Sequence, residues 1–79
     1  MEQPTARNLE KVVDHANRCA AQAERDRNHN ESKERVARRV TEARQYANKA
    51  NEMAQTIATP YAMQLAQFAN DRATYAANL

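Results

Sequence analysis

Residues 36–57 read VARRVTEARQYANKANEMAQTI, and this stretch decides the fold. Its apolar and small residues recur at alternating spacings of four and three, at Val36, Val40, Ala43, Ala47, Ala50, Ala54 and Ile57. This pattern is typical of a helix that packs along one side against another helix. Alanine at so many of these positions predicts that the two helix axes approach closely, because methyl groups hold the backbones only a short distance apart.

A second seam of the same kind lies upstream, at Leu9, Val13, Ala16, Ala20 and Ala23. The two seams are out of register, and the polar residues Asn28, His29 and Asn30 separate them. Such residues favour turns over helix interiors, and Asn28 followed by Glu31 matches a capping box. The sequence therefore predicts helices over about residues 5–28 and 31–58, paired as an antiparallel hairpin.

A third helix is predicted over residues 60–79, because Thr59 suits a helix N-cap and Pro60 suits the first helical position. Its large apolar residues fall on one stripe, which the row of Ala62, Ala66, Ala69, Ala73 and Ala76 widens on one side; the stripe itself is Tyr61, Leu65, Phe68, Tyr75 and Leu79. Tyr46 and Met53, on the flank of the preceding helix, are the predicted docking place for this stripe, either in the same chain or in a partner.

The composition supports one all-α domain over residues 1–79. The chain has 17 alanines and no glycine, which favours helix over a sheet with tight turns. Large apolar side chains are few, so a single chain of 79 residues buries little apolar surface. We therefore expect the three helices to be completed as a dimeric helical bundle.

The same features indicate a non-enzymatic, cytoplasmic protein without a cofactor. No apolar run approaches a membrane span in length, and the first residues lack the pattern of a secretion signal. His15 and Cys19 share a helix face but fall short of a ligand set for a metal, and Cys19 is better explained as a small buried hydrophobe. The single serine and the absence of glycine give no support to catalysis.

Two groups of basic residues are candidates for nucleic-acid contact. Arg7, Lys11, Arg18 and Arg25 share one face of the first helix, and a second cluster contains Arg35, Arg38 and Arg39. Four cations along one face could follow phosphates. Both groups are also explained as solvated surfaces, because acids such as Asp14 and Glu31 lie four residues before a base. Arg39 lies beside Tyr46, where it could stack or pair across an interface.

The candidate protein-binding residues are Tyr46, Met53, Tyr61, Leu65, Phe68, Arg72 and Tyr75. Tyrosine and arginine are enriched in binding hot spots, although core packing explains the aromatic residues equally well. Arg72 lies between Phe68 and Tyr75, so it either snorkels at an edge or meets a carboxylate.

The leading hypothesis is a small regulator or adaptor, of a kind that suits a bacterial or mobile-element gene, that binds itself and another protein. The alternatives are a nucleic-acid-binding regulator that uses the basic faces and a structural subunit of an assembly.

Overall fold

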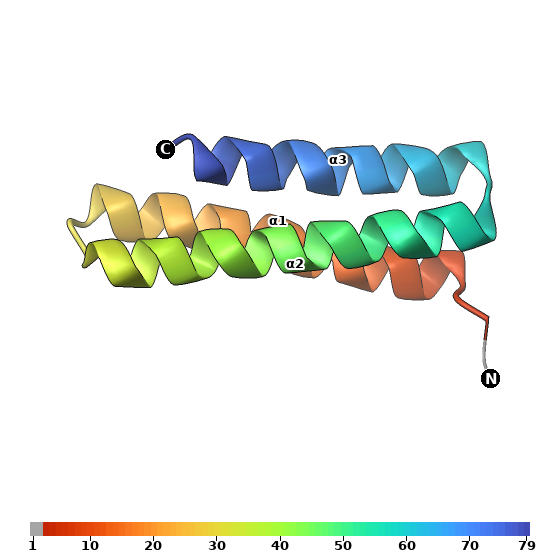
Figure 1. Ribbon diagram of the computed structural model, residues 1–79, viewed down its shortest axis with the longest axis horizontal. Coiled ribbons are helices and arrows are strands. Elements are labelled where there is room, and N and C mark those ends of the chain that lie inside the picture. Colours follow the sequence, from red (N-terminus) through yellow and green to blue (C-terminus); the bar gives the residue numbers. More distant parts are fainter. Residues whose placement is uncertain (1–2) are drawn as a thin grey trace.

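The computed structural model describes residues 3–79, which form three helices and, within that range, no strand. α1 spans Ala6–Asn28, α2 spans Lys33–Ile57 and α3 spans Pro60–Ala77. Figure 1 shows the chain reversing direction at both turns, and every pair of helices is in contact. The prediction of an all-helical chain is confirmed, and the third helix folds back on the first two as one compact three-helix arrangement.

Each helix begins at a hydroxyl side chain. Thr5, Ser32 and Thr59 accept a hydrogen bond from the backbone N–H three residues later, at 3.1, 3.2 and 3.1 Å respectively. Such bonds satisfy an N–H group that the first turn of a helix leaves without a partner. The predicted cap at Thr59 is confirmed. The predicted capping box at Asn28 is wrong, because Asn28 ends α1 and Ser32 caps α2.

Both turns contain a residue in the left-handed conformation, although the chain has no glycine. Asn30 has a φ of 58° in the turn between α1 and α2, and Ala58 has a φ of 59° at the C-cap of α2. Asparagine tolerates this region, whereas the Cβ of alanine is crowded there. Ala58 is therefore a point of local strain that the rest of the fold holds in place.

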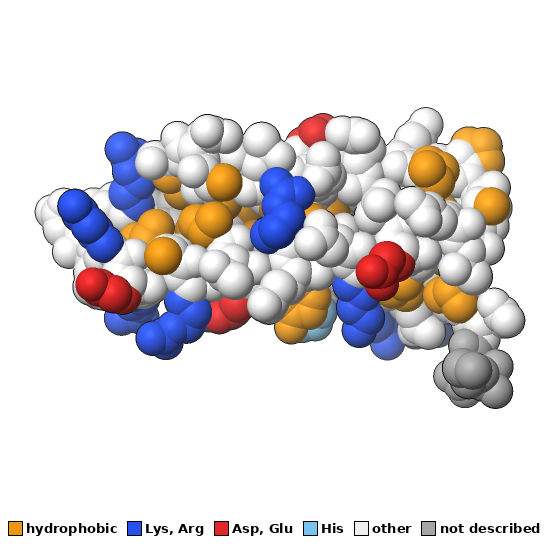
Figure 2. Space-filling model, in the orientation of Figure 1, with side chains coloured by type: hydrophobic (Ala, Val, Ile, Leu, Met, Phe, Trp, Pro, Cys, Tyr) orange, Lys and Arg blue, Asp and Glu red, His pale blue; other side chains and the backbone are white. Residues whose placement is uncertain are grey.

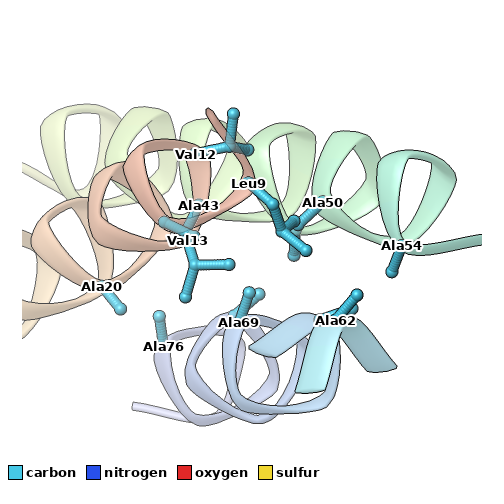
Figure 3. Packing of buried hydrophobic residues seen from close by; sticks show 14 of the residues in the cluster. Leu9, Val12, Val13, Ala20, Ala43, Ala50, Ala54, Ala62, Ala69 and Ala76 are labelled. Carbon is cyan, nitrogen blue, oxygen red and sulfur yellow. The ribbon is translucent and has the colours of Figure 1, made fainter. Parts of the chain in front are cut away.

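The core is made almost entirely of methyl groups. Of its 15 buried apolar residues 12 are alanines, and Leu9 is the one large side chain that is fully buried within the described residues. Figure 3 shows Leu9 pointing toward Ala50, while the alanines of the three helices face one another. The predicted seams are confirmed, since Ala43, Ala47, Ala50 and Ala54 are all buried.

The packing of α3 corrects the sequence-based expectation. Its buried residues are the alanine row, Ala62, Ala66, Ala69, Ala73 and Ala76. The three aromatic residues of the predicted stripe, Tyr61, Phe68 and Tyr75, are instead turned aside and are between 43% and 49% exposed, while its two leucines pack partly buried against the core. The reason is steric: helices that approach closely enough for alanine to pack against alanine leave no room for aromatic rings between them.

Candidate functional site

The aromatic row, defined as Tyr61, Phe68 and Tyr75, runs along the edge of α3 that lies beside α1. Its members are seven residues apart, so they fall on nearly the same side of the helix. Exposed apolar side chains that form a continuous patch on a small protein are a common feature of binding surfaces. The aromatic row is therefore the first feature to examine as a binding site.

Both tyrosines of this row are anchored to α1 by their hydroxyl groups. The Tyr61 hydroxyl donates to Glu10 Oε2 at 2.9 Å, and the Tyr75 hydroxyl donates to Glu24 Oε1 at 2.7 Å. These hydrogen bonds, with desolvation and the nearby carboxylate charges, raise the pKa of each phenol above its ordinary value. The rings are held in one orientation, and their hydrogen-bonding groups are already occupied.

The middle of the row is organised by Arg72. Its Nε donates to Asn17 Oδ1 at 2.9 Å, and its guanidinium carbon lies 4.9 Å from the centre of the Tyr75 ring. Phe68, which has no hydroxyl, occupies the position that corresponds to Tyr61 and Tyr75. Of the two expectations for Arg72, its half-buried place at an edge agrees with a snorkelling side chain, and its partner is a neutral amide of α1 instead of a carboxylate.

The remaining predicted protein-binding residues do not extend this surface. The Tyr46 ring stacks on His15 of α1, with the two ring centres 5.1 Å apart. Met53 lies two turns further along α2 and, like Leu65, packs partly buried against the core. Within the chain, the two tyrosines of the stripe donate to carboxylates of α1 and make no hydrogen bond to Tyr46 or Met53. Docking of the stripe on these residues in a partner stays a prediction.

The basic face of α1 is partly engaged within the chain. All four of its predicted residues are exposed. Arg18 forms an ion pair with Asp14 at 2.9 Å, and Arg25 donates to Gln22 at 3.3 Å. Arg7 and Lys11 take part in none of the ion pairs found between residues 3 and 79. Of the four cations of this face, therefore, only Arg18 has its charge paired with a carboxylate of residues 3–79.

The second basic group, in α2, is mostly paired with acids. Arg35 contacts Glu31 at 3.4 Å and Asp26 at 3.5 Å, so it ties the start of α2 to the end of α1. Arg39 contacts Glu42 at 3.4 Å within its own helix, while Arg38 is exposed. The expected Glu31–Arg35 pair is confirmed. The spacing of four residues would also allow Arg38 to pair with Glu42, but it is Arg39 that contacts this carboxylate.

Asp26 is a residue that the sequence reasoning missed. It is 3% exposed; Gln22 donates to its Oδ1 at 2.7 Å, and Arg35 lies beside its Oδ2. A buried carboxylate needs such partners, since its charge has left water. Asp26 therefore joins the two helices close to their turn, which is a structural role.

Cys19 belongs to α1, lies where this helix contacts α2, and is partly buried. Burial raises the pKa of its thiol, and so does Glu42, whose Oε2 accepts from the sulfur at 3.7 Å. In the part of the chain that the structure describes, no three His, Cys, Asp or Glu side chains come together as metal ligands. Cys19 thus behaves as a small, weakly reactive core residue.

An open groove of about 550 Å³ lies where α3 stops short of the turn between α1 and α2. Its floor is apolar and includes Val36, Val40 and Leu79, and Arg27 and Lys33 stand at its rim. Figure 2 shows this end of the molecule as a run of apolar side chains with basic groups around it. The groove is a second exposed apolar region, separate from the aromatic row.

The α1 residues that contact the two tyrosines of the aromatic row and Arg72 were also missed from the sequence. We call Glu10, Asn17 and Glu24 the acid–amide row; they are seven residues apart, the same spacing as the aromatic row. Matching spacing on two helices predicts a ladder of contacts between them, provided that the helices are neighbours. The sequence alone does not say which helices are neighbours, so the spacing could not be used.

Across the described residues, no helix is both long enough and apolar enough to cross a bilayer. Comparison of the chain with protein-family models, with curated proteins and with solved structures finds no match. The functional assignment therefore depends on the surface itself.

Proposed function

We propose that this protein is a small non-enzymatic regulator or adaptor that acts by binding another protein through the outer edge of α3. The observation that carries the proposal is the division of side chains within that helix. The alanine row is buried, while the aromatic row is nearly half exposed. Exposed aromatic rings that add little to the core represent unused apolar surface, and binding a partner would remove that surface from water.

The geometry of the row suits rigid recognition. Hydrogen bonds to Glu10 and Glu24 hold the two tyrosine rings, so a partner would not have to order them. Preorganised side chains bind more tightly because less conformational entropy is lost on association. Arg72 adds a cation beside Tyr75, and tyrosine with arginine is a common composition for a binding hot spot.

Self-association is part of the same proposal. Among residues 3–79 only one large side chain is completely buried, so folding gains little from bulky apolar groups. A dimer would add buried area without adding chain, and it would complete the bundle that the composition led us to expect.

Nucleic-acid binding has less support as an alternative function. Arg18, Arg35 and Arg39 each contact a carboxylate of the same chain, which lowers the charge they offer to phosphates. Retention on a DNA column at about 50 mM salt, lost steeply as salt rises, would favour this alternative.

The other alternative is a structural subunit of an assembly. It would be favoured if the particle mass measured by light scattering grew without limit as the protein concentration rose.

The proposal is tested by site-specific photo-crosslinking in cells that produce the chain. A photoreactive phenylalanine analogue replaces Phe68 in one variant and Arg38, an exposed residue of α2, in the matched control. We expect strong protein adducts from position 68 and weak ones from position 38. An adduct of twice the 9.0 kDa chain mass identifies self-contact, and other masses identify a foreign partner. Equal adduct yields from both positions, or none from position 68, would overturn the proposal.

A further inference from the structure

The trough between α1 and α2 continues beyond the end of α3. The groove of about 550 Å³ occupies this continuation, where Ala77 and Leu79 of the chain end lie beside Val36 and Val40 of α2. At a rise of 1.5 Å per residue, the first two turns of α2 leave about 12 Å of the trough uncovered. The groove volume lies within the range of ordinary binding clefts, about 300–1,000 Å³.

The seam of α2 changes in side-chain size at this groove. Where α3 covers the seam, its residues are buried alanines, from Ala43 to Ala54. Val36 and Val40 continue the same seam but are only partly buried, because α3 ends beside them. The floor of the groove therefore exposes apolar surface that a further helix turn would remove from water.

Cations stand at both ends of this floor. Arg27 and Lys33 line its outer end. Arg44 lies at the inner end, because Lys33, Val40 and Arg44 are spaced seven and four residues apart and so share one face of α2. Along the helix, Lys33 and Arg44 are about 16 Å apart. Figure 2 shows basic side chains beyond both ends of the apolar run. We call Arg27, Lys33 and Arg44 the groove cations.

The groove cations have no carboxylate partner within residues 3–79. None of them takes part in the ion pairs of this part of the chain. Arg44 donates to two neutral acceptors of α3, Asn70 Oδ1 and, at 3.0 Å, Thr74 Oγ1. Asp71, which follows Asn70 in the sequence, instead accepts from Gln67 at 2.8 Å.

The acids near the outer end are engaged by other groups or lie off the groove face. Glu31 is the one acid among the residues that line the groove, and it contacts Arg35 at 3.4 Å. Glu24, one turn before Arg27 in α1, accepts from the Tyr75 hydroxyl at 2.7 Å. Glu34 lies about 100° around α2 from its neighbour in the groove. The groove therefore presents positive charge at each end of an apolar floor.

We propose that this groove binds a helical segment of another protein, one that carries aliphatic side chains between two acidic ones on a single face. The proposal commits to a helix because α1 and α2, which bound the groove, hold the helix α3 in the same trough. It commits to acids because the groove cations lack them, and complementary charges fix the register of such a contact. This surface is separate from the aromatic row, and the inference does not rest on the proposed function.

A second copy of the chain does not carry the matching segment. The acids of the partner helix must be about eleven residues apart to reach both Lys33 and Arg44. In this sequence only Glu31 and Glu42 have that spacing, and the residues between them on the same helix face are Arg35 and Arg38. A nucleic acid is also a poor match, because no aromatic ring lines the groove for a base to stack on.

The proposal is tested with a synthetic helical peptide of 14 residues that is stapled on its outer face. Glutamate occupies its second and thirteenth positions, leucine its sixth and ninth, and alanine or glutamine the rest. Fluorescence anisotropy of the labelled peptide should give a dissociation constant of about 1–100 μM. Two matched peptides, one with lysine for glutamate and one with alanine for leucine, should each bind at least about tenfold more weakly.

Charge reversal on the protein is the second arm of the test. Lys33→Glu and Arg44→Glu should each weaken binding of the glutamate peptide at least about tenfold. Arg38→Glu makes the same charge change on an exposed part of α2 off the groove face, and should leave the affinity unchanged. The double variant Lys33→Glu/Arg44→Glu should prefer the lysine peptide, a reversal that unfolding cannot produce. Lys33 has no side-chain contact that holds α3, so its variant decides the question if Arg44→Glu loses helicity by circular dichroism.

Several outcomes would overturn the proposal. They are a dissociation constant above about 1 mM for the glutamate peptide, equal binding of the peptide without leucines, and no effect of Lys33→Glu. A DNA duplex or phosphatidylglycerol vesicles that displace the peptide better than unlabelled peptide does would assign the groove to those ligands instead. A loss of self-association in Lys33→Glu, measured by sedimentation equilibrium, would assign it to a second copy. Photo-crosslinking from position 68 tests the proposed function separately, since Phe68→Ala should leave peptide binding in the groove unchanged.

Discussion

The inner and outer sides of α3 carry side chains of opposite size at similar spacing. The alanine row is at most 3% exposed, while the aromatic row is at least 43% exposed. Both rows are apolar, so hydrophobicity alone does not decide which is buried. The difference teaches that the distance between helix axes selects the buried row, because a close approach admits methyl groups and excludes rings.

The helix α1 shows the same rule with one exception. Ala16, Ala20 and Ala23 are fully buried, and so is Leu9, near the start of the helix. Figure 3 places Leu9 opposite Ala50, where alanine partners leave room for a larger group. Leu9 therefore provides the largest single apolar contribution to the core.

The largest expected effect on the free energy of unfolding comes from truncating the side chain of Leu9. Leu9→Ala should lower the free energy of unfolding by about 3 kcal/mol, because it deletes buried methylene groups and leaves a cavity. Urea denaturation followed by circular dichroism measures the change. A loss below about 1 kcal/mol, the range of ordinary surface substitutions, would mean that the alanine contacts alone hold the helices together.

The second-largest effect on the free energy of unfolding is expected when a side chain on the inner side of α3 is enlarged. Ala69→Leu should destabilise the fold by about 2 kcal/mol, since the added carbons have no space between closely spaced helices. Ala77→Leu, at an exposed position of the same helix, is the matched control and should stay within about 0.5 kcal/mol. If both variants unfolded at the same urea concentration, the steric explanation for the buried row would be refuted.

A smaller effect of opposite sign is expected at the turn that brings α3 onto its neighbours. Ala58 is in the left-handed region, so Ala58→Gly should raise the free energy of unfolding by about 1 kcal/mol. The same substitution at Ala37, exposed within α2, should lower it by about 1 kcal/mol. Thermal unfolding of the two variants should shift in opposite directions, and a downward shift in both would contradict the strain at Ala58.

The smallest effect on folding is expected on the outer edge. Phe68→Ala should change the unfolding free energy of the isolated chain by no more than about 0.5 kcal/mol, because the ring is nearly half exposed. The measurement is made at a protein concentration below any self-association. The same variant should weaken the binding that we propose for the aromatic row, so a loss of folding free energy as large as the loss of binding free energy would place Phe68 in the core instead of the binding surface.

Much of the fold could be predicted from the sequence. Heptad spacing located the seams of α1 and α2, and Thr59 with Pro60 marked the start of α3. The start of α2 could not be located as well, because both Asn28 and Ser32 are good caps and the choice depends on how the turn closes. For the candidate site, the sequence analysis named the aromatic row and Arg72 but not the α1 residues that contact them, and the binding role of these residues stays a prediction.

The sequence by itself determined that this protein is helical, roughly where the helices are interrupted by turns, and how side chains are arranged around each helix. These features depend on local periodicity and capping. Only the tertiary structure decided how α3 is rotated about its own axis. The alanine row and the aromatic row satisfy the helical pattern equally, and the close packing of three helices selects the smaller one. That rotation places the aromatic row beside Glu10 and Glu24 and thereby creates the surface.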